Sequence, residues 1–193
     1  RFTETEDDPD LALSAPFPIT KISFFRKVLR DLTGITGFRR YSQALISILK
    51  TDGDNIPDRL KGIWFKIHGF LITNILIFLA ISFFFHWSLY FLLWWLPAFT
   101  YYSLIIRIRN IAEHCVTSGS TDLDNTRTTL TNPIVRFLMA PHRVNYHLEH
   151  HLFMMCPWYN LPKAHKMMIK NGFKDKMCIS NSYRSVLNKA VSA

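Results

Sequence analysis

The sequence predicts an all-α integral membrane protein, built as a transmembrane helical hairpin with a cytosolic helical cap. Two apolar runs, at about 67–85 and 88–106, are each close to the roughly 20 residues that a helix needs to cross a bilayer. Basic residues flank the pair, and three histidines cluster further along the chain. We therefore predict a cytosolic loop with interfacial amphipathic helices at 1–61, the transmembrane hairpin at 62–106, and a cytosolic helical region with the histidine cluster at 107–193.

The composition is not that of an ordinary soluble domain. The formal net charge is +9, and most Lys and Arg lie outside the apolar middle. A basic chain with an apolar centre favours a membrane surface as partner. No zinc-finger, RNP or homeodomain-like pattern is present, so we expect no nucleic-acid partner. The three cysteines, Cys115, Cys156 and Cys178, form no CxxC pair, which excludes a disulfide framework and fits a reducing compartment.

The N-terminal part is predicted to be a loop followed by two helices. Residues 1–20 are acidic and then proline-rich, so their aspartates favour a turn, with a place beside a metal as the alternative (Asp7, Asp8, Asp10). Ser23 is expected to cap an amphipathic helix that ends before Gly34. Its apolar face opposes basic residues, which is typical of a helix in the bilayer interface, with packing on a protein core as the alternative. That face comprises Phe24, Phe25, Val28, Leu29 and Leu32. A second short helix is expected over 41–50, before a polar break at 51–58.

The apolar middle predicts two membrane-spanning helices joined by a tight turn. In the first run only His68 and Asn74 are strongly polar. His86 and Trp87 separate the runs, and this joint is too short for a soluble loop but long enough for a hairpin. Pro97 should kink the second span. A large buried hairpin in a soluble protein is the alternative.

Basic residues predict the orientation of the hairpin. Lys61 and Lys66 precede it, and Arg107 and Arg109 follow it. Because such residues mark the cytosolic side, both ends are expected in the cytosol. The segments after the hairpin would then share that face, where a metal site can meet a soluble electron donor.

The most informative motif is Asn145-Tyr-His-Leu-Glu-His-His-Leu-Phe153. Helical offsets of three and four residues return to one face, so His147, His150 and His151 can aim at one point. Convergent imidazoles indicate a transition-metal site, and a basic solvated helix face is the alternative. His114, four residues after Asn110 on the predicted continuation of the second span, is a fourth candidate ligand. Imidazole does not choose the metal, and the four histidines can also close a zinc site.

Residues around this motif have weaker signals. Glu149 and Glu113 are candidates to orient an imidazole, as are Asp122 and Asp124. The other histidines are expected away from the metal: His165 exposed, His68 in the membrane and His86 at the hairpin tip. His142 is expected as a polar surface or hydrogen-bonding residue, with a metal ligand as the alternative. Residues 117–129 should form a loop. A helix is expected from Pro162 to Gly172, followed by a short helix and a frayed tail.

Four stretches resemble the membrane fatty acid desaturases. The segment 145–153 looks like their third histidine box, H-x-x-H-H, and is the most specific match. RFTETEDDPD at 1–10 resembles the stretch after their second box, and PWYNLP at 157–162 the segment after the third. RNIAEH at 109–114 is similar to the Asn-x-x-x-His element of the stearoyl-CoA desaturases. The resemblance covers most of the chain apart from its last twenty residues.

The resemblance implies a non-haem diiron enzyme that uses O2 to introduce a double bond into the acyl chain of a lipid or acyl-CoA. It implies that the iron ligands include His114, His147, His150 and His151, with Asn110 acting through water. It also implies electron delivery by a ferredoxin or a cytochrome b5-like protein. No catalytic side chain is expected beyond the metal ligands, because no side chain can oxidise an unactivated alkyl chain.

The sequence departs from the family pattern in one respect. The other two histidine boxes are missing, so we expect the remaining ligands upstream of Arg1 and expect this chain alone to be inactive. Two alternatives stay open. A related hydroxylase or ketolase can use the same iron site, and a zinc hydrolase or a non-redox binding or transport protein can use the same histidines.

Overall fold

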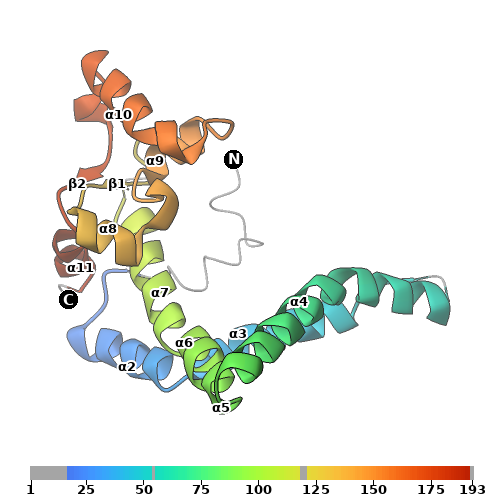
Figure 1. Cartoon of the computed structure of the whole chain (residues 1–193). Coiled ribbons are helices and arrows are strands. Elements are labelled where there is room, and N and C mark those ends of the chain that lie inside the picture. The colour runs from blue at the N-terminus through green and yellow to red at the C-terminus, as the bar shows by residue number, and fades with distance from the viewer. Residues whose placement is uncertain (1–16, 54, 118–120, 192–193) are drawn as a thin grey trace. The chain divides into compact units, whose positions relative to one another are not determined.

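The structure is a computed structural model of the whole chain, and it describes residues 17–53, 55–117 and 121–191 (Figure 1). The predicted aspartates Asp7, Asp8 and Asp10 lie outside the described residues. The described chain is mostly helical and divides into two compact units. One unit is Lys27–Leu104, and the other joins the residues through Arg26 to those from Ile105 onward.

The first two helices are α2 (Lys21–Leu32) and α3 (Ile35–Leu49). Thr20 accepts a hydrogen bond from the Ser23 amide at 3.2 Å, so the predicted Ser23 cap is wrong and Thr20 takes that role. Gly34 ends α2 as predicted, because its φ of 82° is a left-handed conformation that glycine adopts without strain. α3 begins directly after Gly34, earlier than the predicted helix at 41–50.

Part of the apolar face predicted for α2 packs against the protein, and part of it is exposed. Phe24 packs against the core of the unit that includes residues 105–191, and Val28 is partly covered. The outward stripe of α2 is exposed, and α3 has a similar stripe. These exposed residues are Ile22, Phe25, Leu29 and Leu32 on α2, and Ile35, Phe38, Leu45, Ile46 and Leu49 on α3.

The first predicted span, 67–85, ends one residue beyond α4 (Ile56–Phe84) and otherwise lies within it. This helix begins earlier than expected because Asn55 caps it, accepting from the Asp58 amide at 3.0 Å, and Pro57 occupies its first turn. The 51–58 segment is therefore only partly a break. No residue of α4, all of which the structure describes, is buried. Asn74 is satisfied by neighbours: it accepts from Tyr90 Oη at 2.8 Å and from Trp94 Nε1 at 3.1 Å.

The second span is a helix with an irregular middle. After the turn at His86 and Trp87 it runs from Ser88 to His114. Its segments are α5 (Ser88–Tyr90), the π-helical η1 (Phe91–Trp95), α6 (Leu96–Phe99) and α7 (Tyr101–His114). The wide π turn directly precedes Pro97, whose missing amide and ring disturb the helical ladder. The kink predicted at Pro97 stays a prediction, and the irregularity that the structure has before Pro97 is the π-helical segment. Both long helices are long and apolar enough to cross a membrane.

The other unit contains the elements around the histidines. After α7 they are β1 (Thr128–Thr129), α8 (Pro133–Met139), η2 (Pro141–Arg143), α9 (His147–Leu152), η3 (Trp158–Asn160), α10 (Leu161–Lys170), η4 (Lys174–Lys176), β2 (Ile179–Ser180) and α11 (Tyr183–Ala190). The strands pair in parallel, Thr128 with Ile179 and Thr129 with Ser180. The all-α prediction misses this sheet, because strands of two residues carry no alternating pattern. α10 matches the predicted helix, with Pro162 in its first turn and Gly172 at φ 80° beyond its end.

Two apolar clusters hold this unit together. Ile111 and Cys115 meet Val186 and Ala190, which packs α11 against the end of α7. Leu148 meets Met168 and Met177, which fixes α9 against α10. Burial raises the pKa of the Cys115 thiol to about 12, so this cysteine packs as an inert apolar group.

The contact between α3 and α6 generates a stability prediction. A Cβ atom on Gly37 would lie 2.3 Å from the Phe99 carbonyl oxygen, which is backbone that cannot move freely. Gly69 in α4 has no atom within 4 Å of its Cβ position among the described residues. Gly37→Ala should therefore destabilise the protein by about 2 kcal/mol, whereas Gly69→Ala should be neutral or stabilise by up to about 1 kcal/mol. Thermal unfolding of the two variants in the same detergent tests this, and equal midpoints would contradict it.

Candidate metal centre

The end of α7 is held by a buried arginine. Arg127 donates to the Ala112 oxygen at 3.2 Å and to the Val116 oxygen at 2.7 Å. Its amide donates to the Glu113 oxygen at 2.9 Å. The last carbonyls of a helix lack partners within the helix and carry partial negative charge, so a guanidinium there satisfies and stabilises them. Arg127 thereby places the end of α7, including His114, next to β1.

The start of the histidine box is held by the same segment. The Thr129 amide donates to the Asn145 oxygen at 2.9 Å. The Asn145 side chain returns a hydrogen bond to the Thr129 oxygen at 3.2 Å. α7 and α9 are therefore both fixed to residues 127–129. This brings together histidines that lie 33 residues apart in the chain.

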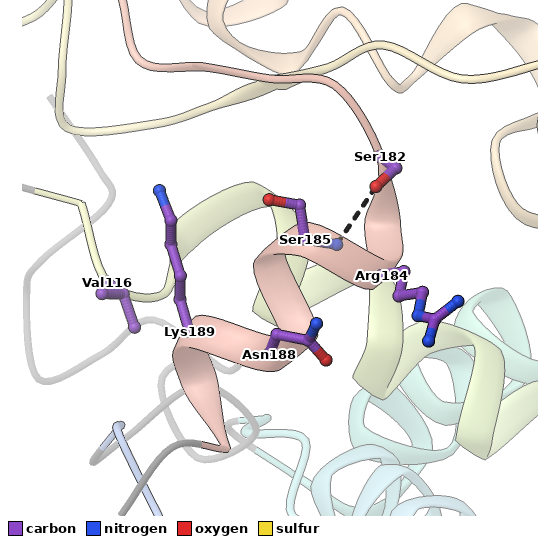
Figure 2. A pocket seen from close by; sticks show the side chains of 6 residues that line it. All are labelled: Val116, Ser182, Arg184, Ser185, Asn188 and Lys189. Atoms are coloured by element: carbon purple, nitrogen blue, oxygen red, sulfur yellow. Dashed lines mark hydrogen bonds between the residues drawn. The ribbon is translucent and has the colours of Figure 1, made fainter.

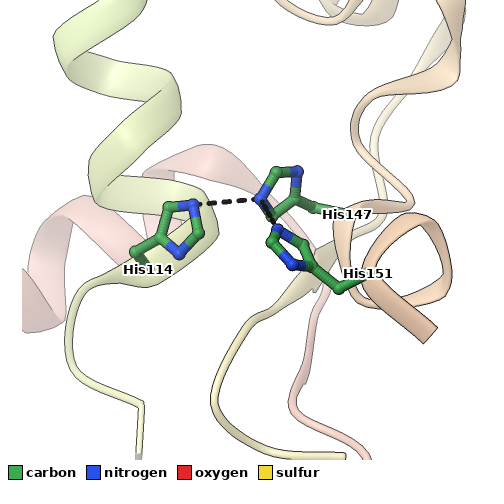
Figure 3. Close-up of side chains that lie close together, drawn as sticks. All are labelled: His114, His147 and His151. Carbon is green, nitrogen blue, oxygen red and sulfur yellow. Dashed lines mark hydrogen bonds between the residues drawn. The ribbon is translucent and has the colours of Figure 1, made fainter. Parts of the chain in front are cut away.

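Three of the predicted ligands converge: His114 from α7, and His147 and His151 from α9 (Figure 3). The Nε2 atom of His147 lies 3.0 Å from Nε2 of His114 and 2.9 Å from Nε2 of His151. Nitrogens bound about 2.1 Å from one metal and roughly at right angles are separated by about 3.0 Å. The donor type fits a transition metal held by three imidazoles, and the three candidate ligand atoms all lie within 4.8 Å of one another.

The electrostatics favour neutral imidazole at the centre of the group. Burial lowers the pKa of His147 well below its ordinary value of 6.5, and the neighbouring His114, His151, His150 and Arg109 lower it further. Neutral imidazole is the form that binds a metal, so the site is prepared for an ion without first losing a proton.

Glu113 is the carboxylate behind His147. Its Oε2 lies 3.8 Å from Nδ1 of His147, on the ring edge away from the shared Nε2 contacts, and its Oε1 accepts from Arg109 Nε at 3.2 Å. A carboxylate behind a metal-binding imidazole fixes the ring and raises its basicity. At 3.8 Å the pair is longer than a hydrogen bond, so the role of Glu113 as an orienting acid stays a prediction. Arg109 is engaged with Glu113 and Arg107 is buried, so neither is an exposed flanking charge.

Two further predicted ligands lie outside the three-histidine group. His150 is exposed on α9, with its ring centroid 6.0 Å from that of His147 and 5.8 Å from that of His151. Asn110 is buried on α7, and its Nδ2 has no hydrogen-bond partner among the described residues. A buried amide donor normally has a partner or an ordered water. Their roles as ligand and as water-mediated contact stay predictions.

Glu149 and His165 differ from expectation. His165 is not exposed: its side chain is 12% accessible, and its Nδ1 lies 2.5 Å from Oε1 of Glu149. Glu149 thus contacts a histidine outside the metal group. The sequence offered one missed signal: His165 lies four residues after Leu161 on α10, on a helix that must pack against the box. His142 is exposed as predicted, and Asp124 accepts from the Thr121 amide in a turn.

A surface pocket near the C-terminus does not include the three histidines (Figure 2). It is lined by Val116, Ser182, Arg184, Ser185, Asn188 and Lys189. In it, Ser182 accepts from the Ser185 amide at 3.1 Å and caps α11.

Comparison with known proteins agrees with the resemblance noted in the sequence. The model of one family, described as fatty acid desaturase, matches residues 1–176. The match includes every histidine of the cluster and ends before α11. No curated protein and no solved structure matches the chain.

The depressed pKa of His147 generates a prediction for the metal-free protein. Below pH 6.5 the unfolded chain protonates this residue while the folded state keeps it neutral, so stability is present above that pH and falls as the pH is lowered through it. The unfolding midpoint of the wild type should therefore fall between pH 7 and 5. His147→Asn should fall less steeply, and the exposed-site control His142→Asn should follow the wild type. Parallel curves for wild type and His147→Asn would contradict the assignment.

Proposed function

The chain belongs to the fatty acid desaturase family, and from this premise we propose that it provides one side of a membrane diiron centre that desaturates an acyl chain. Membership assigns it a desaturase- or hydroxylase-type oxidoreductase function in fatty acid metabolism. The observation that carries the proposal is the convergence of His114, His147 and His151, whose spacing fits a metal.

The proposed centre uses the residues already described. His114, His147 and His151 would hold the metal, with His150 as a further ligand and Asn110 acting through water. Iron supplies, when bound, the oxidising power that removal of hydrogen from an unactivated alkyl chain requires. The protein's own part is to keep His147 neutral, to hold its ring through Glu113, and to position the acyl chain so that selected carbons react.

We further propose that the chain is a multi-pass membrane protein with the histidines on the cytosolic side. An apolar helix such as α4, with no buried residue, suits a hydrocarbon environment better than a soluble core. A lipid or acyl-CoA substrate would then reach the site from the membrane, and an electron donor, a ferredoxin or a cytochrome b5-like protein, from the cytosol.

The exposed stripes of α2 and α3 support a place for these helices on the bilayer surface. Large apolar residues line one side of each helix, and Arg26 on α2 and Arg39 on α3 lie beside them. A helix with an apolar face beside basic residues binds anionic lipid surfaces.

The placement of α3 on the bilayer surface predicts opposite environments for labels on its two sides. In the protein reconstituted in anionic vesicles, with its other cysteines replaced, a spin label at position 38 should be accessible to O2 and protected from a water-soluble nickel complex. A label at position 47, an exposed site about 180° around the helix from position 38, should show the reverse. Equal water exposure at both positions would remove α3 from the interface.

The proposed reaction is tested by the mass of the lipid product. In cells that express the complete protein, an acyl chain lighter by two hydrogens is expected. His147→Ala should lower the amount of this product by about 100-fold or more, because a proposed metal ligand is lost. The exposed-site control His142→Asn should leave the amount of product unchanged. Gain of one oxygen would instead indicate a hydroxylase or ketolase. Zinc at one per chain without O2 consumption would reject the redox proposal.

A further inference from the structure

Glu149 lies in the middle of the histidine-box helix and is completely buried. Its Oε2 accepts from the Thr128 hydroxyl at 2.5 Å, and its Oε1 lies 2.5 Å from Nδ1 of His165. A carboxylate can only accept, so the His165 nitrogen donates. The two partners come from β1 and α10, so the carboxylate joins three elements.

The position of Glu149 on α9 determines what this contact controls. Residues four apart share a helical face, whereas a residue two positions from each lies about 200° around the axis. His147 and His151 therefore lie on one face of α9, and Glu149 lies on the opposite face. Anchoring that opposite face fixes the rotation of the helix about its axis, and with it the direction of both imidazoles.

α9 needs such an anchor because it is short. It has six residues, and an isolated helix of that length has little stability of its own in water. Apolar packing of Leu148 against Met168 and Met177 holds it against α10 but is not directional. Two hydrogen bonds to a buried carboxylate are directional, and leaving the carboxylate without them is costly.

We propose that His165 and Thr128, acting through Glu149, are positioning residues for the metal ligands His147 and His151. The inference rests on the proposed metal site and adds to it two residues that are not ligands. The ring of Tyr146, 5.4 Å from that of His165, packs against the same anchor at the start of the box.

The test titrates Co2+ alone into the purified protein and records its visible absorption spectrum, which reports ligand geometry. His165→Leu should weaken Co2+ binding by about tenfold and alter the spectrum, as loss of the hydrogen-bonded support of metal ligands does. His165→Asn places an amide nitrogen where Nδ1 stood and should restore the spectrum, with affinity within about threefold of the wild type. Lys166→Leu, an exposed site on the same helix, is the matched control and should change neither.

A second measurement on the metal-free protein makes the outcome independent of the metal proposal. Hydrogen exchange of the amides of 147–153 should accelerate in His165→Leu and in Thr128→Val, but not in Lys166→Leu. If the wild type binds no Co2+, the proposed metal site fails and the exchange result alone decides the positioning role. Unchanged exchange in His165→Leu would overturn the inference. If the wild type binds Co2+, the same Co2+ affinity and spectrum in His165→Leu as in the wild type would overturn it too.

Discussion

The candidate metal site depends on the short segment of residues 127–129. Arg127 caps the carbonyls that end α7, while Thr129 exchanges two hydrogen bonds with Asn145 at the start of the histidine box. Among the described residues, neither apolar cluster joins α7 to α9. The distance of 3.0 Å between His114 and His147 is therefore set by a buried polar bridge, which fixes direction as well as proximity.

Two buried carboxylates, Glu113 and Glu149, lie close to this bridge. Glu113 faces the His147 ring directly and is itself held by Arg109. Glu149 faces the opposite side of α9, where Thr128 and His165 hold it. A metal site on a short helix would need each imidazole to be oriented as a ring and the helix to be fixed in its rotation about its axis.

The unit Lys27–Leu104 is stabilised in a different way. Its helices satisfy their backbone groups internally, and the polar side chain of Asn74 is satisfied by Tyr90 and Trp94. Close approach at Gly37 and the π turn before Pro97 are the local departures from regular helix packing. The apolar surface exposed on α2, α3 and α4 is of the kind that a lipid bilayer or a partner protein covers.

Local information determined much of this protein. The apolar runs, the turn at His86 and Trp87, the stop at Gly34 and the spacing of His147 and His151 could be predicted, because each depends on neighbours within a few residues. Tertiary structure decided the rest. The pairing of Thr128 with Ile179, the cap by Arg127, and the contact of His165 with Glu149 join residues whose separation leaves no periodic trace. Even the direction of Glu149, adjacent to the candidate ligand His150 in the chain, followed from which partner could satisfy a buried carboxylate.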